Sequence, residues 1–153
     1  MANFLTCEGL ILARLQAKID AVDWTGKTKP VVLAEAEVER IEERSQVAPA
    51  VWVLLNGYQP VQDVTPGIAT IELSWQIVVA VRSGYGMGSG DGVRIEAAPI
   101  IDVVIDALLG WRPSKDFQSM KLDQSPGPGY SDAGFGYFPH NFTTRTQVRG
   151  SVT

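Results

Sequence analysis

The sequence predicts a two-layer α+β domain in which two helices cover one face of a mainly antiparallel sheet. Two segments with helical periodicity are separated and followed by segments that alternate as β-strands do. We expect the order α-β-β-β-α-β-β, without a tandem repeat. Because strands consecutive in sequence tend to pair as neighbours, both helices would lie on the same face of one sheet. A chain of 153 residues is long enough for one domain with a substantial core, so we expect residues 1–153 to form a single domain.

The first helix is expected from Asn3 to Val22. Asn3 is a suitable N-cap residue, and Gly9 is the weakest position in the segment. Cys7 is the only cysteine, so it cannot form an internal disulfide, and we expect it to act as a small buried hydrophobe. One stripe of the helix is apolar and consists of Phe4, Ile11, Leu12, Leu15, Ile19 and Val22.

The second helix lies within Val93–Pro113. Its opposite face carries Asp102 and Asp106, and Gly110 suits the left-handed position just after a helix. Proline in a helix interior removes a hydrogen bond, so we expect the helix to begin near Ala98, with Pro99 in its first turn. The apolar positions with helical spacing are Ile101, Val104, Ile105 and Leu108.

Four other segments have the sequence patterns of β-strands. One further segment is ambiguous between strand and helix. Residues 31–44 alternate as a strand does but also fit a helix, and we favour a strand that leads into an irregular or helical end. The apolar run 50–58 predicts a strand with turn residues at Asn56-Gly57, and the two-proline segment 59–67 predicts a loop. The remaining predicted strands are 68–83, 117–124 and about 137–148, with loops at 84–92 and 125–136.

The charge of the chain disfavours a general role in binding nucleic acid. With 13 Lys and Arg against 17 Asp and Glu, the net charge is −4, although a local basic patch remains compatible with it. Acidic residues gather between Glu35 and Glu43, whereas the tail from His140 to Thr153 has Arg145 and Arg149 and no acidic side chain. Both segments can be solvated surface or complementary subunit contacts. No apolar run approaches the ~20 residues of a membrane span, and nothing indicates export.

The sequence offers no set of residues that predicts catalysis, a metal or a cofactor. Residues 21–28 fit a relaxed phosphate-loop pattern that includes Lys27, but a helix precedes this segment, whereas a phosphate loop follows a strand. His140 is the only histidine, and together with Cys7 it is too few for a tetrahedral zinc site. Asp102 and Asp106 are four residues apart on an amphipathic helix, where such pairs usually form a solvated face.

Several aromatic and basic residues in loops are candidate contacts with partners. Tyr85, Tyr130 and Phe135 lie in glycine-rich loops, and aromatic side chains bury much area at little cost in conformational entropy. The aromatic residues carry no interleaved Lys or Arg, so a platform for stacking single-stranded nucleic acid is disfavoured. The candidate interface residues are Tyr85, Met87, Trp111, Arg112, Tyr130, Phe135, Arg145 and Arg149.

Three segments together resemble a known family. They are the run from Pro49 to Tyr58, the long alternating strand ending near Val81, and the helix end Leu108-Leu109-Gly110-Trp111-Arg112-Pro113. In this element order they resemble the small tail terminator (tail completion) proteins of long-tailed bacteriophages. The resemblance implies a structural virion protein without enzymatic activity, catalytic residues or cofactors.

The resemblance also implies partners and a place of action. It implies a homo-oligomeric ring, typically a hexamer, that caps the tail tube protein and offers its opposite face to the head connector or neck protein. Assembly would take place in the host cytoplasm and the ring would lie at the head-proximal end of the tail, with DNA passing through it and no membrane contact. The alternatives are a neck or head–tail adaptor protein and, from another class, a small hydrolase or nucleotide-binding enzyme that uses Asp102, Asp106 or Lys27.

Overall fold

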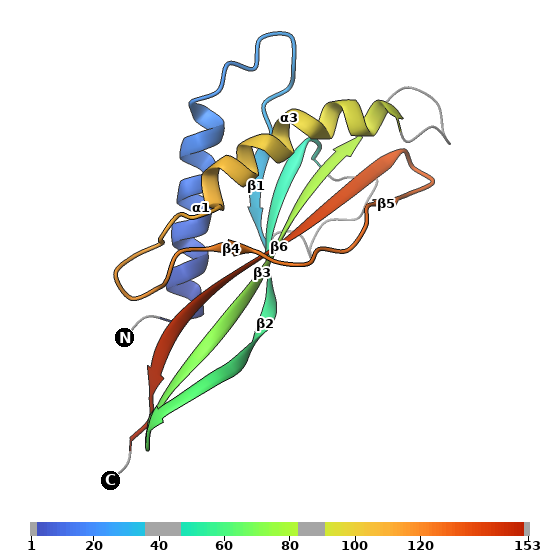
Figure 1. Ribbon diagram of the computed structural model, residues 1–153. Helices are drawn as coiled ribbons and strands as arrows, with labels where there is room; N and C mark the ends of the chain where they lie inside the picture. Colours follow the sequence, from blue (N-terminus) through green and yellow to red (C-terminus); the bar gives the residue numbers. More distant parts are fainter. Residues whose placement is uncertain (1–2, 36–46, 83–90, 152–153) are drawn as a thin grey trace.

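The computed structural model describes residues 3–35, 47–82 and 91–151, and shows two helices packed on one sheet (Figure 1). The helices are α1 (Phe4–Asp20) and α3 (Asp91–Leu108). The strands are β1 (Val31–Ala34), β2 (Ala50–Thr65), β3 (Ile68–Arg82), β4 (Lys121–Leu122), β5 (Gly129–Tyr130) and β6 (Phe135–Arg149).

The sheet confirms the predicted α+β class. Its strand order is β1-β2-β3-β6-β4, with β5 paired to β6. Among the strands of the described residues, only the β1–β2 pair is parallel, and the other pairs are antiparallel. The predicted element order is confirmed for the described residues, with the two-residue β5 as an addition. Of the ambiguous segment 31–44, residues 31–34 form a strand, and residues 36–46 lie outside the described residues.

The first helix begins where the sequence places it. The Asn3 side chain accepts a hydrogen bond from the Thr6 backbone N–H at 2.9 Å, as an N-cap does. The face toward the core buries Cys7, Ile11, Leu15 and Ile19. Phe4 at the first turn is 46% exposed, so the apolar stripe extends beyond the covered surface.

The second helix begins earlier than expected, at Asp91, so the predicted start near Ala98 is wrong. Pro99 lies in the helix interior, where its missing N–H leaves the Ile95 carbonyl without its helical donor. Ile95 is 75% exposed, so water can reach this turn of the helix. The predicted end is confirmed, because α3 stops at Leu108 and Gly110 adopts a positive φ of 77°.

Strand β2 continues through residues 59–65, so the predicted loop at 59–67 is wrong. Three register shifts absorb the irregular sequence, and Gly57 has a φ of 113° at the first of them. Pro60 is tolerated because β1 pairs with residues 50–53, and among the described residues no strand pairs with this edge of β2 beyond them. Pro66 and Gly67 then form a two-residue turn into β3.

The predicted strand 117–124 is shorter than expected. Only Lys121 and Leu122 form β4, and Phe117 adds an isolated bridge to Thr146 of β6. The predicted last strand is confirmed and starts slightly earlier, at Phe135.

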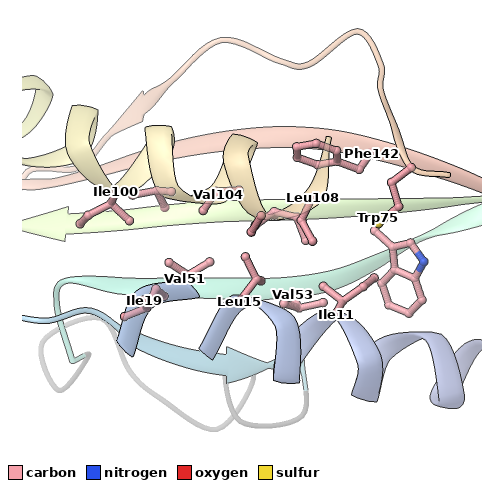
Figure 2. Close-up of a cluster of buried hydrophobic side chains, with 14 of the residues drawn as sticks. Ile11, Leu15, Ile19, Val51, Val53, Trp75, Ile100, Val104, Leu108 and Phe142 are labelled. Atoms are coloured by element: carbon pink, nitrogen blue, oxygen red, sulfur yellow. The ribbon is translucent and has the colours of Figure 1, made fainter. Parts of the chain in front are cut away.

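The core lies between the helices and one face of the sheet (Figure 2). Strand β3 contributes its alternating residues Leu73, Trp75, Ile77, Val79 and Val81, which are all buried as the sequence predicts. The neighbouring strands contribute Val51 and Val53 from β2 and Phe142 from β6. Buried side chains of α1 and α3 pack against them and complete the core. Both helices therefore lie on the same face, as expected.

Three strands project past the helices (Figure 1), and at the base of this projection Leu73 still belongs to the core. We call this projection the arm; it consists of residues 57–65 of β2, 68–74 of β3 and 143–149 of β6, which pair in that order. The arm positions the candidate site, because a loop after α3 folds back along its β6 edge.

Candidate functional site

A pocket of about 570 Å³ lies where the segment after α3 meets the arm. We call it the basic pocket because four of its lining residues are cationic: Arg112, Lys115, Arg145 and Arg149. Its remaining lining residues are Thr70, Asp116, Phe117, Gln118, Thr146 and Gln147. Three of the four cations are residues that the sequence marked as interface candidates, and the fold brings them together from two distant segments.

The wall formed by residues 112–118 is held rigid by Arg112. Its Nε donates to the carbonyls of Phe117 at 2.7 Å and Ser114 at 3.1 Å, and its Nη2 donates to the Lys115 carbonyl at 2.6 Å. A guanidinium that binds three carbonyls fixes the backbone around it. Arg112 thus shapes the wall, and much of its donor capacity is already used.

The same wall is tied to the edge of β6. The Gln118 N–H donates to the Arg145 carbonyl at 2.9 Å. The hydroxyls of Thr144 and Thr146 donate to the carbonyls of Gln118 at 2.6 Å and Asp116 at 2.7 Å. Both threonines are buried, so these bonds are shielded from water. The pocket is therefore a fixed surface feature of the subunit.

The cations of the pocket differ in how far they are neutralised. Arg145 donates from Nε to a Glu72 carboxylate oxygen at 2.9 Å. Lys115 and Arg149 are exposed and make no side-chain hydrogen bond or ion pair within the described part of the chain. These two residues provide the uncompensated positive charge, and they are the groups available to an anionic partner.

The other expected interface residues lie elsewhere. Trp111 is half-buried under the guanidinium of Arg14, which lies 5.6 Å from its ring centre. Tyr130 is 47% exposed and accepts a hydrogen bond from Arg94 at 3.1 Å. Phe135 is only 2% exposed and stacks on Tyr137, so it packs within the subunit. Tyr85 and Met87 lie outside the described residues.

The phosphate-loop pattern at residues 21–28 forms an ordinary turn between α1 and β1. The Lys27 N–H donates to the Trp24 carbonyl, and the Thr25 N–H donates to the Asp23 side chain. These amides are used within the turn, and a helix precedes it as the sequence indicated. The segment therefore lacks the convergent amides of a phosphate site.

The remaining titratable candidates are not arranged for chemistry. Asp106 forms an exposed ion pair with Lys18 at 3.6 Å, and Asp102 is exposed one turn earlier on α3. Burial raises the pKa of the Cys7 thiol to about 12, so the thiol stays protonated. Burial also lowers the pKa of His140, although backbone hydrogen bonds oppose that shift. Within the described ranges, no three His, Cys, Asp or Glu side chains are grouped to hold a metal.

Lys115 is the one cation of the basic pocket that the sequence did not mark. It stands between Ser114 and Asp116 with no charge pattern around it. Only the return of residues 112–118 along β6 places it beside Arg145 and Arg149.

In residues 3–35, 47–82 and 91–151, neither helix has the length and apolar character needed to span a membrane.

One comparison with known proteins identifies a family, and another shows a similar fold. The sequence matches the phage tail terminator protein family over residues 1–152. No curated protein sequence matches the chain. Among solved structures, the fold is similar to a chain from the virion of a native gene transfer agent (GTA) particle, with a TM-score of 0.54 and 16% sequence identity. That similarity covers 92% of this chain and 96% of the other. Because the family match spans nearly the whole sequence, the protein belongs to the phage tail terminator family.

Proposed function

We propose that this protein forms a ring that caps the tail tube and joins it to the head connector. Family membership makes the protein a structural component of the virion tail and not an enzyme. The ring, its closure on the tube and its contact with the connector are the proposal. The observation that carries it is the match to the terminator family over residues 1–152.

The shape of the subunit supports a structural role. A rigid body of helices and sheet carries an arm whose β2 edge has no partner strand among the described residues. Register shifts and Pro60 interrupt that edge, and such features disfavour uncontrolled strand addition. The arm is therefore suited to contacts through its side chains, as an assembly with defined subunit positions requires.

Imaging and mass measurement test the proposal. The purified protein, alone or mixed with purified tail tubes, should form closed rings in electron micrographs, and particle mass should be a whole multiple of the subunit mass. Rings should sit at one end of each tube and should block further addition of tube subunits. A protein that stays monomeric and never binds tube ends would contradict the proposal.

Binding to the connector distinguishes a terminator from a neck adaptor. A terminator should bind tubes without connector present, and the capped tubes should then bind connector particles. Binding to the connector alone, with no affinity for tubes, would favour an adaptor instead.

A further inference from the structure

The sheet separates two charged surfaces at its opposite edges. The basic pocket lies at the β6 edge, where β4, β5 and the segment around Phe117 pair with β6. The other edge is formed by β1, on which α1 packs. Glu35 directly follows β1, and Glu8 lies on α1. We call Glu8 and Glu35 the acidic edge.

The acidic edge has no cationic partner within the described part of the chain. Glu8 and Glu35 are both half-buried, and neither makes an ion pair or side-chain hydrogen bond in the described part of the chain. Burial raises the pKa of Glu8, and the negative charge of Glu35 raises it further. The two carboxylates therefore repel one another, and a cation brought between them would relieve that repulsion.

We propose that the basic pocket of one subunit contacts the acidic edge of a second copy of this chain, in a head-to-tail arrangement. This inference rests on the proposed ring and specifies the contact that closes it. A ring requires two different, complementary patches on each subunit, whereas a two-fold dimer would bring the same patch of both subunits together. Here a two-fold contact would place Lys115 and Arg149 against their own copies, and the charges would repel.

A second copy fits the pocket better than DNA does. Two of the four cations already have partners within the subunit, Arg112 on carbonyls and Arg145 on Glu72. Lys115 and Arg149, which have no side-chain partner among the described residues, are instead matched in number by Glu8 and Glu35 at the other edge.

Charge reversal at each edge tests this contact. The basic-edge variant is Lys115→Glu with Arg149→Glu, and the acidic-edge variant is Glu8→Lys with Glu35→Lys. Arg112 and Arg145 are left intact because both are bound within the fold. Each variant alone should need a concentration about tenfold higher or more for half-assembly than the original protein. Assembly is measured by light scattering on a sizing column and by electron microscopy at low salt, with tail tubes added if the original protein requires them.

Mixing the two variants provides the decisive measurement. In the mixture, the reversed basic pocket of one variant meets the reversed acidic edge of the other, so alternating rings should assemble as the original protein does. Combining all four substitutions in one chain should also restore assembly. Rescue of this kind identifies a contact between subunits, because a contact with the tube would not be restored by a second variant.

The control for the basic-edge variant is Lys27→Glu with Lys121→Glu, which makes the same change in net charge as that variant at exposed residues that do not line the basic pocket. It should assemble normally. Thermal unfolding followed by circular dichroism should show that all variants fold, and a variant that fails to fold is replaced by the neutral substitutions Lys115→Gln, Arg149→Gln or Glu35→Gln.

The outcomes separate this inference from the proposed function. If the original protein forms rings and both reversal variants assemble equally well, the inference fails and the ring stands. If the original protein forms no ring with or without tubes, the ring itself fails. Loss of salt-sensitive binding to a short DNA duplex by the basic-edge variant, without any change in assembly, would assign the pocket to nucleic acid and overturn the inference.

Discussion

The three long strands differ sharply between the half that the helices cover and the half that forms the arm. In the covered half, Val51, Trp75 and Phe142 are completely buried against α1 and α3. In the arm, Tyr58 is 68% exposed and Val61 is 37% exposed. The arm keeps its shape through strand pairing and through the hydroxyl bonds of Thr144 and Thr146 to the wall at 116–118.

Different interactions therefore stabilise the two parts of the same strands. Burial of apolar area stabilises the covered half, so its sequence is restricted to apolar residues of suitable size. The arm depends on backbone bonds and local polar contacts, so its exposed positions can carry charge without loss of the fold. Arg145 and Arg149 lie in the arm, and the basic pocket is therefore built where substitutions affect stability least.

The largest expected effect is in the covered half, at Leu108. Replacing Leu108 by Ala removes a side chain with no exposed area and leaves a cavity, so the free energy of unfolding should fall by about 2–5 kcal/mol. Leu109→Ala is a matched control, because Leu109 is the next residue and is 52% exposed. Urea titration should show a change within about 0.5 kcal/mol for the control. Equal effects would mean that Leu108 is not a core residue.

Replacing a glycine by alanine should destabilise both halves of the strands, but for different physical reasons. A Cβ at Gly136, in the covered half, would lie 3.0 Å from Val93 Cβ, so Gly136→Ala should destabilise by about 1–3 kcal/mol through overpacking. At Gly57 in the arm there is open space, but its φ of 113° disfavours any side chain, and Gly57→Ala should cost about 1 kcal/mol. Gly127→Ala has neither problem and should be near neutral in thermal unfolding. A neutral Gly136→Ala would contradict the close packing of α3 on β6.

Thr146→Val tests the link between the arm and the pocket wall. The substitution removes the 2.7 Å hydrogen bond to the Asp116 carbonyl while keeping the side-chain shape, so stability should fall by about 0.5–1.5 kcal/mol. Exchange of the Gln118 amide hydrogen should accelerate, because that amide pairs with Arg145 on the same edge. Thr70→Val, in the arm without a side-chain hydrogen bond among the described residues, is the control. Unchanged exchange at Gln118 would show that the wall does not depend on this bond.

The covered half and the β3 and β6 parts of the arm could be predicted from the sequence, whereas the β2 part of the arm could not. Alternation from Ile71 to Val81 and the stripe through Ile11, Leu15 and Ile19 arise from burial on one side, and burial leaves a periodic pattern. In the β2 part of the arm, residues 59–62 and Thr65 are exposed and bulges break the register, so residues 59–65 show no alternation and the sequence predicts a loop there. Pro99 misled the prediction of α3 for a related reason, since the exposed side of that turn tolerates a missing N–H.

The candidate site was predictable only in part. Arg145 and Arg149 were noticeable as charges in a tail without carboxylates, and Arg112 was noticeable beside Trp111. Their meeting depends on how residues 112–118 turn back along β6, which a lone sequence does not encode as a periodic signal. Phe135 shows the opposite limitation, because an aromatic residue next to glycines gives the same local pattern whether it is exposed or buried.

The smallest expected effect is at the ion pair of the arm. Glu72→Gln keeps the side-chain shape and removes the charge that faces Arg145, so stability should fall by about 0.2–1 kcal/mol at low salt. The loss of stability should shrink in about 1 M salt, where charges are screened beyond roughly 3 Å.

The same substitution leaves Arg145 without its carboxylate partner beside Lys115 and Arg149, so the basic pocket gains net positive charge. If the pocket meets the acidic edge of another subunit, Glu72→Gln should lower the concentration needed for assembly while it weakens the fold. Opposite signs for stability and assembly cannot arise from simple damage to the arm, and a parallel loss of both would count against the pocket as the contact surface.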